Sequence, residues 1–209
     1  MGIKNIIFDL GGILLELYPE RTINEFEKLG IHRKIGEKAH SYSDKVFTDF
    51  ETGKITADEF IAKTKEISNN SISDEEITFA WNAMICDFPE EHVELLRSLK
   101  NKGYLIYLLS NTNTMHVNAF ESMFYNKFSF DIKTLFDKAL YSNEIGYRKP
   151  HKETFIAVID LLEIVPAETL MIDDSLANIE GANLAGMQTL HIETNNDIIE
   201  PLKEIKIKL

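Results

Sequence analysis

The sequence predicts an α/β fold: a doubly wound parallel sheet with a helical cap inserted into it. An apolar run over residues 3–8 is followed by Asp9, Gly11 and Gly12, as expected of a strand that is buried on both faces and ends in a turn. From residue 89 onward, helical patterns alternate with short apolar runs, which is typical of strand–helix–strand units. Between these regions the strand signals disappear. We therefore expect residues 1–16 and 87–209 to form the α/β core and residues 17–86 to form the cap.

The first strand delivers a carboxylate to its own carboxyl end. In open α/β sheets, ligands bind just beyond the carboxyl ends of the strands. Asp9 is therefore placed for chemistry. The alternative is that Asp9 only ends the strand and caps a turn, because Asp and Gly are ordinary turn residues.

The insertion has clear helix signals. Residues 20–29 form a helical pattern that ends at Gly30, a C-terminal capping position. Thr56 with Glu59, and Ser73 with Glu76, have the spacing of capping boxes that open helices. An insertion at this point of the chain is well placed to cover the strand ends and exclude water. Tyr18, Phe47, Phe50 and Glu51 are the cap candidates for contacting a substrate, with the alternative that aromatic residues at helical spacing belong to a core. Trp81 is expected to pack between cap helices.

The second half of the chain supplies the remaining elements. Helices are predicted at residues 89–102, 151–162 and 175–185, and a helical, aromatic-rich region extends to about residue 136. Strands are predicted at residues 104–109, 138–141, 169–172 and 188–192.

The composition limits the classes of function. A chain of 209 residues with 44% hydrophobic residues can bury one substantial core. A net charge of −12 disfavours nucleic acid and anionic membrane partners. The single cysteine, Cys86, cannot form an internal disulfide, and no signal or membrane-spanning segment is evident, so a cytoplasmic location is expected. The expected partner is a small molecule, and the choice between monomer and homodimer stays open.

Reactive side chains follow three further segments. Ser110 and Asn111 follow a predicted strand, Lys149 lies in a loop, and Asp173 and Asp174 follow another strand. In a parallel sheet these positions meet Asp9 at one edge. Three crowded carboxylates repel one another unless a cation neutralises them, and an all-oxygen cluster suits Mg²⁺. The lysine, the hydroxyl and the nearby helix N-termini would complete a phosphate pocket. Taken singly, each of these residues has an ordinary alternative as a cap, a turn or a surface charge.

The order of these segments resembles the four motifs of the haloacid dehalogenase (HAD) superfamily. The motifs match as Phe8-Asp9-Leu10-Gly11-Gly12, Leu109-Ser110-Asn111-Thr112, Arg148-Lys149-Pro150 and Ile172-Asp173-Asp174-Ser175. The insertion lies where members of subfamily I carry a small helical cap. Residues 110–113, the tandem aspartates and residues 177–182 are most similar to the bacterial α-D-glucose-1-phosphate phosphatase branch. The phosphatase domain attached to epoxide hydrolases is a more distant relative.

The resemblance implies a Rossmann-like core and a Mg²⁺-dependent phosphomonoester hydrolase. Asp9 would be the nucleophile that forms an aspartyl phosphate, and Ser110 and Lys149 would act with it on the phosphoryl group. Besides Asp9, the metal would be held by Asp174, by the Gly11 carbonyl and, as an outer or alternate ligand, by Asp173. Substrate-binding residues would be Ser110, Asn111, His116 and Lys149.

The chain departs from the usual pattern at Gly11. Most phosphatases of the superfamily carry there a second aspartate, which protonates the leaving oxygen. The glucose-1-phosphate branch shares the glycine. Since an anomeric hydroxyl is more acidic than a simple alcohol and leaves with less protonation, we expect a preference for sugar 1-phosphates. An alternative is that His116 donates the proton. The simpler interpretation is that His116 is hydrogen-bonded within the protein and has no catalytic role.

Two other functions remain open. A 2-haloacid dehalogenase also uses a nucleophilic aspartate and lacks the second one. Its chemistry needs no metal, so the tandem Asp173-Asp174 fits it poorly. A non-catalytic module could keep the fold and use the cap to bind a protein, and Gly11 is its support.

Overall fold

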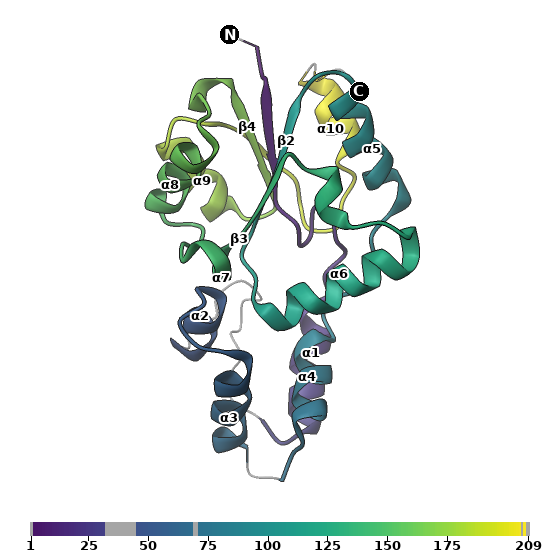
Figure 1. The fold of residues 1–209 in the computed structure, drawn as a ribbon, viewed down its shortest axis with the longest axis vertical. Helices are drawn as coiled ribbons and strands as arrows, with labels where there is room; N and C mark the ends of the chain where they lie inside the picture. The colour runs from purple at the N-terminus through teal and green to yellow at the C-terminus, as the bar shows by residue number, and fades with distance from the viewer. Residues whose placement is uncertain (1, 32–44, 69–70, 206, 208–209) are drawn as a thin grey trace.

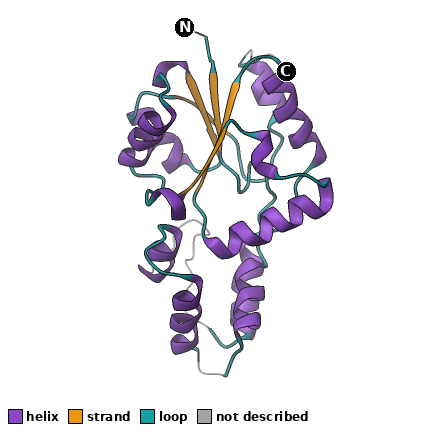
Figure 2. Ribbon diagram, in the orientation of Figure 1, coloured by secondary structure: helices purple, strands orange, loops and turns teal. Residues whose placement is uncertain are grey.

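The sheet of the computed structural model, which describes residues 2–31, 45–68, 71–205 and 207, is parallel throughout. Its five strands have the order β3-β2-β1-β4-β5, with β1 at the centre (Figure 2). They are β1 (Asn5–Phe8), β2 (Leu105–Ser110), β3 (Lys138–Tyr141), β4 (Thr169–Asp173) and β5 (Gln188–His191). The predicted α/β fold with a parallel sheet is confirmed.

Helices cover both faces of the sheet (Figure 1). One face packs against α5 (Glu90–Asn101), α6 (Thr114–Phe128) and α10 (Ile199–Glu204), and the other against α8 (Lys152–Leu162) and α9 (Leu176–Leu184). The central strand supplies both cores, since Ile6 and Phe8 belong to the first and Ile7 to the second. This alternation is the period of two that an extended strand imposes.

The inserted region contains α1 (Pro19–Lys28), α2 (Lys45–Glu51), α3 (Ala57–Ile67) and α4 (Asp74–Asn82). Figure 1 shows these helices on the side of the sheet where the strands end. They share a hydrophobic core around Phe26, Phe60 and Trp81. Both predicted capping boxes open their helices. The side chains of Thr56 and Ser73 each accept from the backbone N–H three residues further on, and the glutamate at that position accepts from the backbone N–H of the Thr or Ser. The predicted cap also includes residues 32–44 and 69–70, which lie outside the described residues, and its bounds stay a prediction.

Several stretches differ from the prediction. The aromatic-rich helical region ends early, because Ser129 adopts a left-handed conformation (φ 62°) after α6 and a short 3₁₀ helix, η1 (Ile132–Leu135), follows. A one-turn helix, α7 (Ser142–Ile145), was not predicted, and a second 3₁₀ turn, η2 (Pro166–Glu168), precedes β4. No helix within the described segments is both long enough and apolar enough to span a membrane.

Candidate active site

The carboxyl ends of the three central strands meet at one edge of the sheet. Phe8 of β1 pairs in register with Leu108 of β2 and Ile172 of β4. The residues that follow these positions, including Asp9 and Asp173, therefore emerge side by side. Carboxylate oxygens of Asp9, Asp173 and Asp174 lie within 4.8 Å of one another. The structure thus brings together the carboxylates that the motifs single out.

Lys149 lies at the centre of this cluster and is 1% exposed. Its Nζ contacts the Leu109 carbonyl at 2.9 Å, Asp173 Oδ2 at 2.7 Å and Asp9 Oδ1 at 2.9 Å. These three oxygens use all three N–H groups of the ammonium. Lys149 therefore fixes the Asp9 carboxylate, and in this arrangement it acts on a bound anion through its charge. A direct hydrogen bond from Lys149 to a phosphoryl oxygen stays a prediction.

Asp9 is held through one of its two oxygens. Oδ1 accepts the Leu10 N–H at 2.7 Å as well as the lysine, and within the described chain Oδ2 is the oxygen left for a ligand. Burial raises the pKa of Asp9 to about 7; Lys149 opposes this rise, and repulsion from Asp173 and Asp174 adds to it. Additional positive charge beside the cluster would favour the ionised, nucleophilic form.

The two tandem aspartates have different surroundings. Asp173 is fully buried, and besides Lys149 its carboxylate accepts from the Ser175 N–H and from Asn178 Nδ2. Asp174 lines the pocket, and its Oδ2 accepts from the Thr194 hydroxyl at 2.5 Å. Asp174 is thus the accessible member of the pair, and Asp173 is bonded within the protein.

The donor set fits Mg²⁺. The cluster has three carboxylates against one lysine and offers oxygen ligands, which this ion prefers. Asp9, Asp174 and the carbonyl of Gly11 would hold the metal, with Asp173 as outer support. Gly12 lets Asp174 approach: its φ is +79°, and a Cβ there would lie 2.6 Å from Asp174 Oδ2.

A side chain at Gly11 would require the Leu17 side chain to move. A Cβ at this position would lie 2.2 Å from Leu17 Cδ1. The Leu17 main chain is held on both sides by Asn195, which accepts its N–H at 3.1 Å and donates to its carbonyl at 2.9 Å. The space next to the position of the usual second aspartate is therefore occupied by leucine.

Ser110 and Asn111 play different parts at the end of β2. Ser110 is 4% exposed and lines the pocket, which fits the predicted contact with a phosphoryl group. The side-chain amide of Asn111 instead pairs with the backbone of Lys149, donating to its carbonyl and accepting its N–H, both at 3.0 Å. Asn111 therefore positions the lysine loop, and its predicted contact with the substrate stays a prediction.

His116 lines the pocket, but both of its ring nitrogens are occupied. Nε2 lies 3.1 Å from the Trp81 carbonyl and Nδ1 lies 3.2 Å from Asn113 Nδ2. Burial lowers the pKa of His116 to about 4, although the bond to Trp81 opposes this. This geometry fits a neutral ring bonded within the protein and argues against the proposed proton donor. A contact between the ring and a substrate stays a prediction.

A pocket of about 340 Å³ connects this cluster to the cap. Of the four cap candidates, Glu51 lines it, whereas Phe47 and Phe50 pack against Trp81 in the cap core, so their predicted role was wrong. Arg21 lies over the Tyr18 ring, which is not part of the lining. The apolar residues of the pocket lining include Leu15, Leu17, Pro19, Met84, Ile85 and Phe120.

Trp81 packs between cap helices as predicted, and it also joins the cap to the core. Its ring stacks on His116 at 4.8 Å, and its N–H donates to Asn113 Oδ1 at 3.2 Å. Sequence patterns did not indicate the ion pair between Arg148 and Glu51, which lies at the wall of the pocket. The only signal for Arg148 was its place next to Lys149.

Comparisons with known proteins show the family of the chain. A family model of haloacid dehalogenase-like hydrolases matches residues 3–186, so the chain belongs to this family. It is similar to the D-ribitol-5-phosphate phosphatase of Bacteroides thetaiotaomicron, with 29% identity over 195 residues that cover 93% of this chain and 94% of the relative. The fit to the narrower α-D-glucose-1-phosphate phosphatase branch stays a prediction.

Solved structures show the same fold. A HAD family enzyme of Bacteroides thetaiotaomicron, in complex with magnesium and inorganic phosphate, is 36% identical with a TM-score of 0.85, covering 95% of this chain and 98% of that one. A HAD-like family hydrolase of Porphyromonas gingivalis is 27% identical with a TM-score of 0.88 over the full length of both chains.

Proposed function

We propose that the protein is a Mg²⁺-dependent phosphomonoester hydrolase that acts through an aspartyl phosphate. The observation that carries the proposal is the Asp9 carboxylate, held by Lys149 at 2.9 Å beside Asp174 in a pocket between the sheet and the cap. A bound Mg²⁺ would supply the positive charge that phosphoryl transfer requires. The magnesium and phosphate in a solved relative support this assignment.

In the first step, Asp9 attacks phosphorus while the P–O bond to the organic group breaks, and the leaving oxygen keeps that electron pair. Lys149 and the Leu10 N–H bind Oδ1 and so hold the carboxylate in the position from which it attacks. Ser110 donates to a phosphoryl oxygen. Water then hydrolyses the aspartyl phosphate to inorganic phosphate and restores the carboxylate.

The substrate is a small phosphorylated sugar or polyol. A pocket of about 340 Å³ admits a metabolite of this size. The relative named for D-ribitol 5-phosphate supports a polyol or sugar phosphate. Because no acid stands at Gly11, the enzyme favours leaving groups that need little protonation, such as the anomeric oxygen of a sugar 1-phosphate.

A panel of phosphate esters with graded leaving-group acidity tests the proposal. We expect turnover with Mg²⁺, none with EDTA, and none in Asp9→Asn, together with rates that rise with leaving-group acidity. Equal rates across the panel, with chemistry rate-limiting, would contradict the leaving-group argument. Metal-independent turnover of 2-chloropropionate would identify a dehalogenase, and binding of Mg²⁺ and phosphate without turnover of any ester would identify a non-catalytic module.

A further inference from the structure

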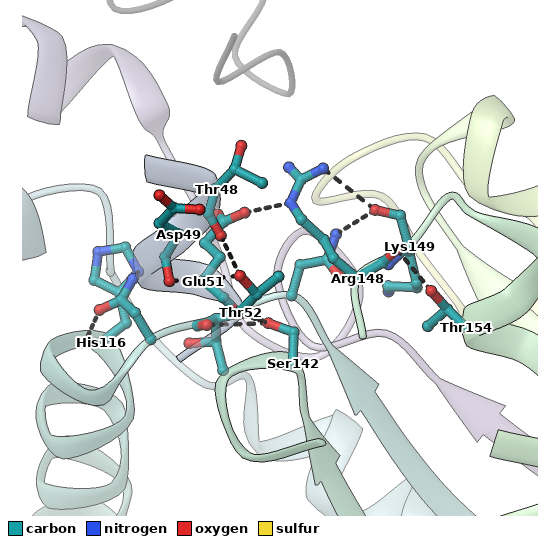
Figure 3. A network of polar contacts seen from close by, with 12 residues as sticks. Thr48, Asp49, Glu51, Thr52, His116, Ser142, Arg148, Lys149 and Thr154 are labelled. Atoms are coloured by element: carbon teal, nitrogen blue, oxygen red, sulfur yellow. Dashed lines mark hydrogen bonds and ion pairs between the residues drawn. The ribbon is translucent and has the colours of Figure 1, made fainter. Parts of the chain in front are cut away.

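An ion pair joins the cap to the core at the wall of the pocket (Figure 3). Glu51, the last residue of α2, accepts from Nε of Arg148, the residue before Lys149. The side chains are 8% and 18% exposed, respectively. Burial raises the pKa of Glu51 and Arg148 opposes this rise, as expected of a carboxylate largely removed from water. The pair thus lies close to the phosphate end of the site.

Both partners are held in place by further bonds (Figure 3). The Glu51 carbonyl accepts from the Ser142 hydroxyl at 2.6 Å, and the same hydroxyl accepts the Thr112 N–H at 2.9 Å. Arg148 donates through Nη1 to the Lys149 carbonyl at 3.3 Å, and its own carbonyl accepts from Thr154 at 2.7 Å. The donors and acceptors of the pair therefore have fixed positions relative to Lys149.

The ion pair has no net charge, and each partner keeps a polar group that a ligand can bind. Among the described residues, Glu51 Oε1 and Arg148 Nη2 have no recorded partner, and both residues line the pocket. A carboxylate oxygen accepts from a hydroxyl and a guanidinium nitrogen donates to one. A second anionic group on a substrate would compete with Glu51 for Arg148 and bring two negative charges together. Such a group is disfavoured because like charges repel strongly where water is largely excluded.

We propose that the Glu51–Arg148 pair selects phosphate esters whose organic part is neutral and carries hydroxyl groups, and rejects esters with a second negative group. This inference rests on the proposed function, whose substrate class it specifies. Glu51 provides the hydroxyl acceptor and the repulsion, and Arg148 provides the donor. Because Glu51 comes from the cap, this selection operates when the cap is packed against the core as in this structure.

Binding to an Asp9→Asn protein tests the inference without turnover. Calorimetry with Mg²⁺ would compare ribitol 5-phosphate with 2-phosphoglycolate, using inorganic phosphate as the reference that both esters share. We expect ribitol 5-phosphate to bind about 10-fold more tightly, the difference made by one good polar contact. Adding Glu51→Gln should remove this difference: 2-phosphoglycolate gains about 10-fold because Arg148 is released from a charged partner, so the two esters bind about equally. Inorganic phosphate should keep its affinity, which shows that the variant is folded.

The matched control is Glu75→Gln, which makes the same charge change at an exposed position of α4. It should alter neither ester. Equal affinities in Asp9→Asn, or a Glu51→Gln effect that is the same for both esters, would overturn the inference. A wild-type protein that hydrolyses no ester would refute the proposed function instead, and the binding comparison would still decide the role of the pair.

Discussion

The closeness of Leu17 to Gly11 leads to a prediction about introducing the missing general acid at position 11. Gly11→Asp alone should fail to raise activity, because its Cβ would lie 2.2 Å from Leu17 Cδ1 and 3.2 Å from Leu17 Cγ. Ordinary carbon contacts are about 3.5–4.0 Å. The Leu17 main chain is tied to Asn195, so its side chain has to leave its place. Overpacking in a core costs about 1–3 kcal/mol, and we expect the lower end of this range because Leu17 is half-buried and lines the pocket.

The stability part is measured by urea denaturation of a double-mutant cycle. Gly11→Ala should destabilise by about 1 kcal/mol in the wild-type background and by much less in Leu17→Ala, where the clashing carbons are gone. Equal costs in both backgrounds would refute the steric reasoning. The cycle uses alanine so that no new charge interferes with the metal site.

The catalytic part is measured with two esters. Gly11→Asp combined with Leu17→Ala should raise kcat for a simple alkyl phosphate by about 10²-fold, at the lower end of general acid catalysis. The gain for p-nitrophenyl phosphate should be small, because its leaving group departs without a proton. A uniform gain for both esters, or none in the double variant, would show that position 11 does not limit protonation of the leaving group.

Two other predictions concern buried groups. Lys149→Met leaves Asp9 and Asp173 together without their cation, and in the absence of Mg²⁺ it should lower the free energy of unfolding by about 3–5 kcal/mol, measured by urea denaturation. The control Lys152→Met, at an exposed position, should change it by no more than about 0.5 kcal/mol. Equal effects of the two substitutions would contradict the reasoning. The pKa of His116 falls from 6.5 to about 4 on folding. Below pH 6.5 the unfolded state therefore binds a proton that the folded ring does not bind, and the free energy of unfolding decreases as the pH is lowered. Between pH 7 and pH 4 the wild type should lose about 3 kcal/mol more than His116→Gln, and parallel curves would contradict this.

Local signals in the sequence predicted most of the fold. The capping boxes at Thr56 and Ser73 act through bonds within one helical turn, and such bonds depend little on distant residues. The end of α6 at Ser129 was missed because the left-handed region is uncommon for serine. The short helix α7 was missed for a different reason. Its first residue, Ser142, is held by Thr112 and by the Glu51 carbonyl, both far away in the chain.

The site was predictable as a set of residues but not as a set of bonds. The motif order indicated that Asp9, Lys149 and the tandem aspartates meet. It did not indicate that the Asn111 amide would pair with the Lys149 backbone, because asparagine after a strand serves equally well for a turn or a ligand. The ion pair that joins Glu51 to Arg148 spans 97 positions of the chain, and no local pattern indicates a pairing at that distance.

The different roles of the tandem aspartates follow from the alternation of strand side chains. Met171 and Ile7 both belong to the core on the side of α8 and α9. Two residues further along their strands, Asp173 and Asp9 should point to that same side, where the loop before α8 delivers Lys149. This explains why one lysine contacts both carboxylates. Asp174, the next residue, should point away from that core, and it lines the pocket. Exchanging the roles of the two aspartates would require a shift of β4 by one residue, which would also move Met171 out of its core.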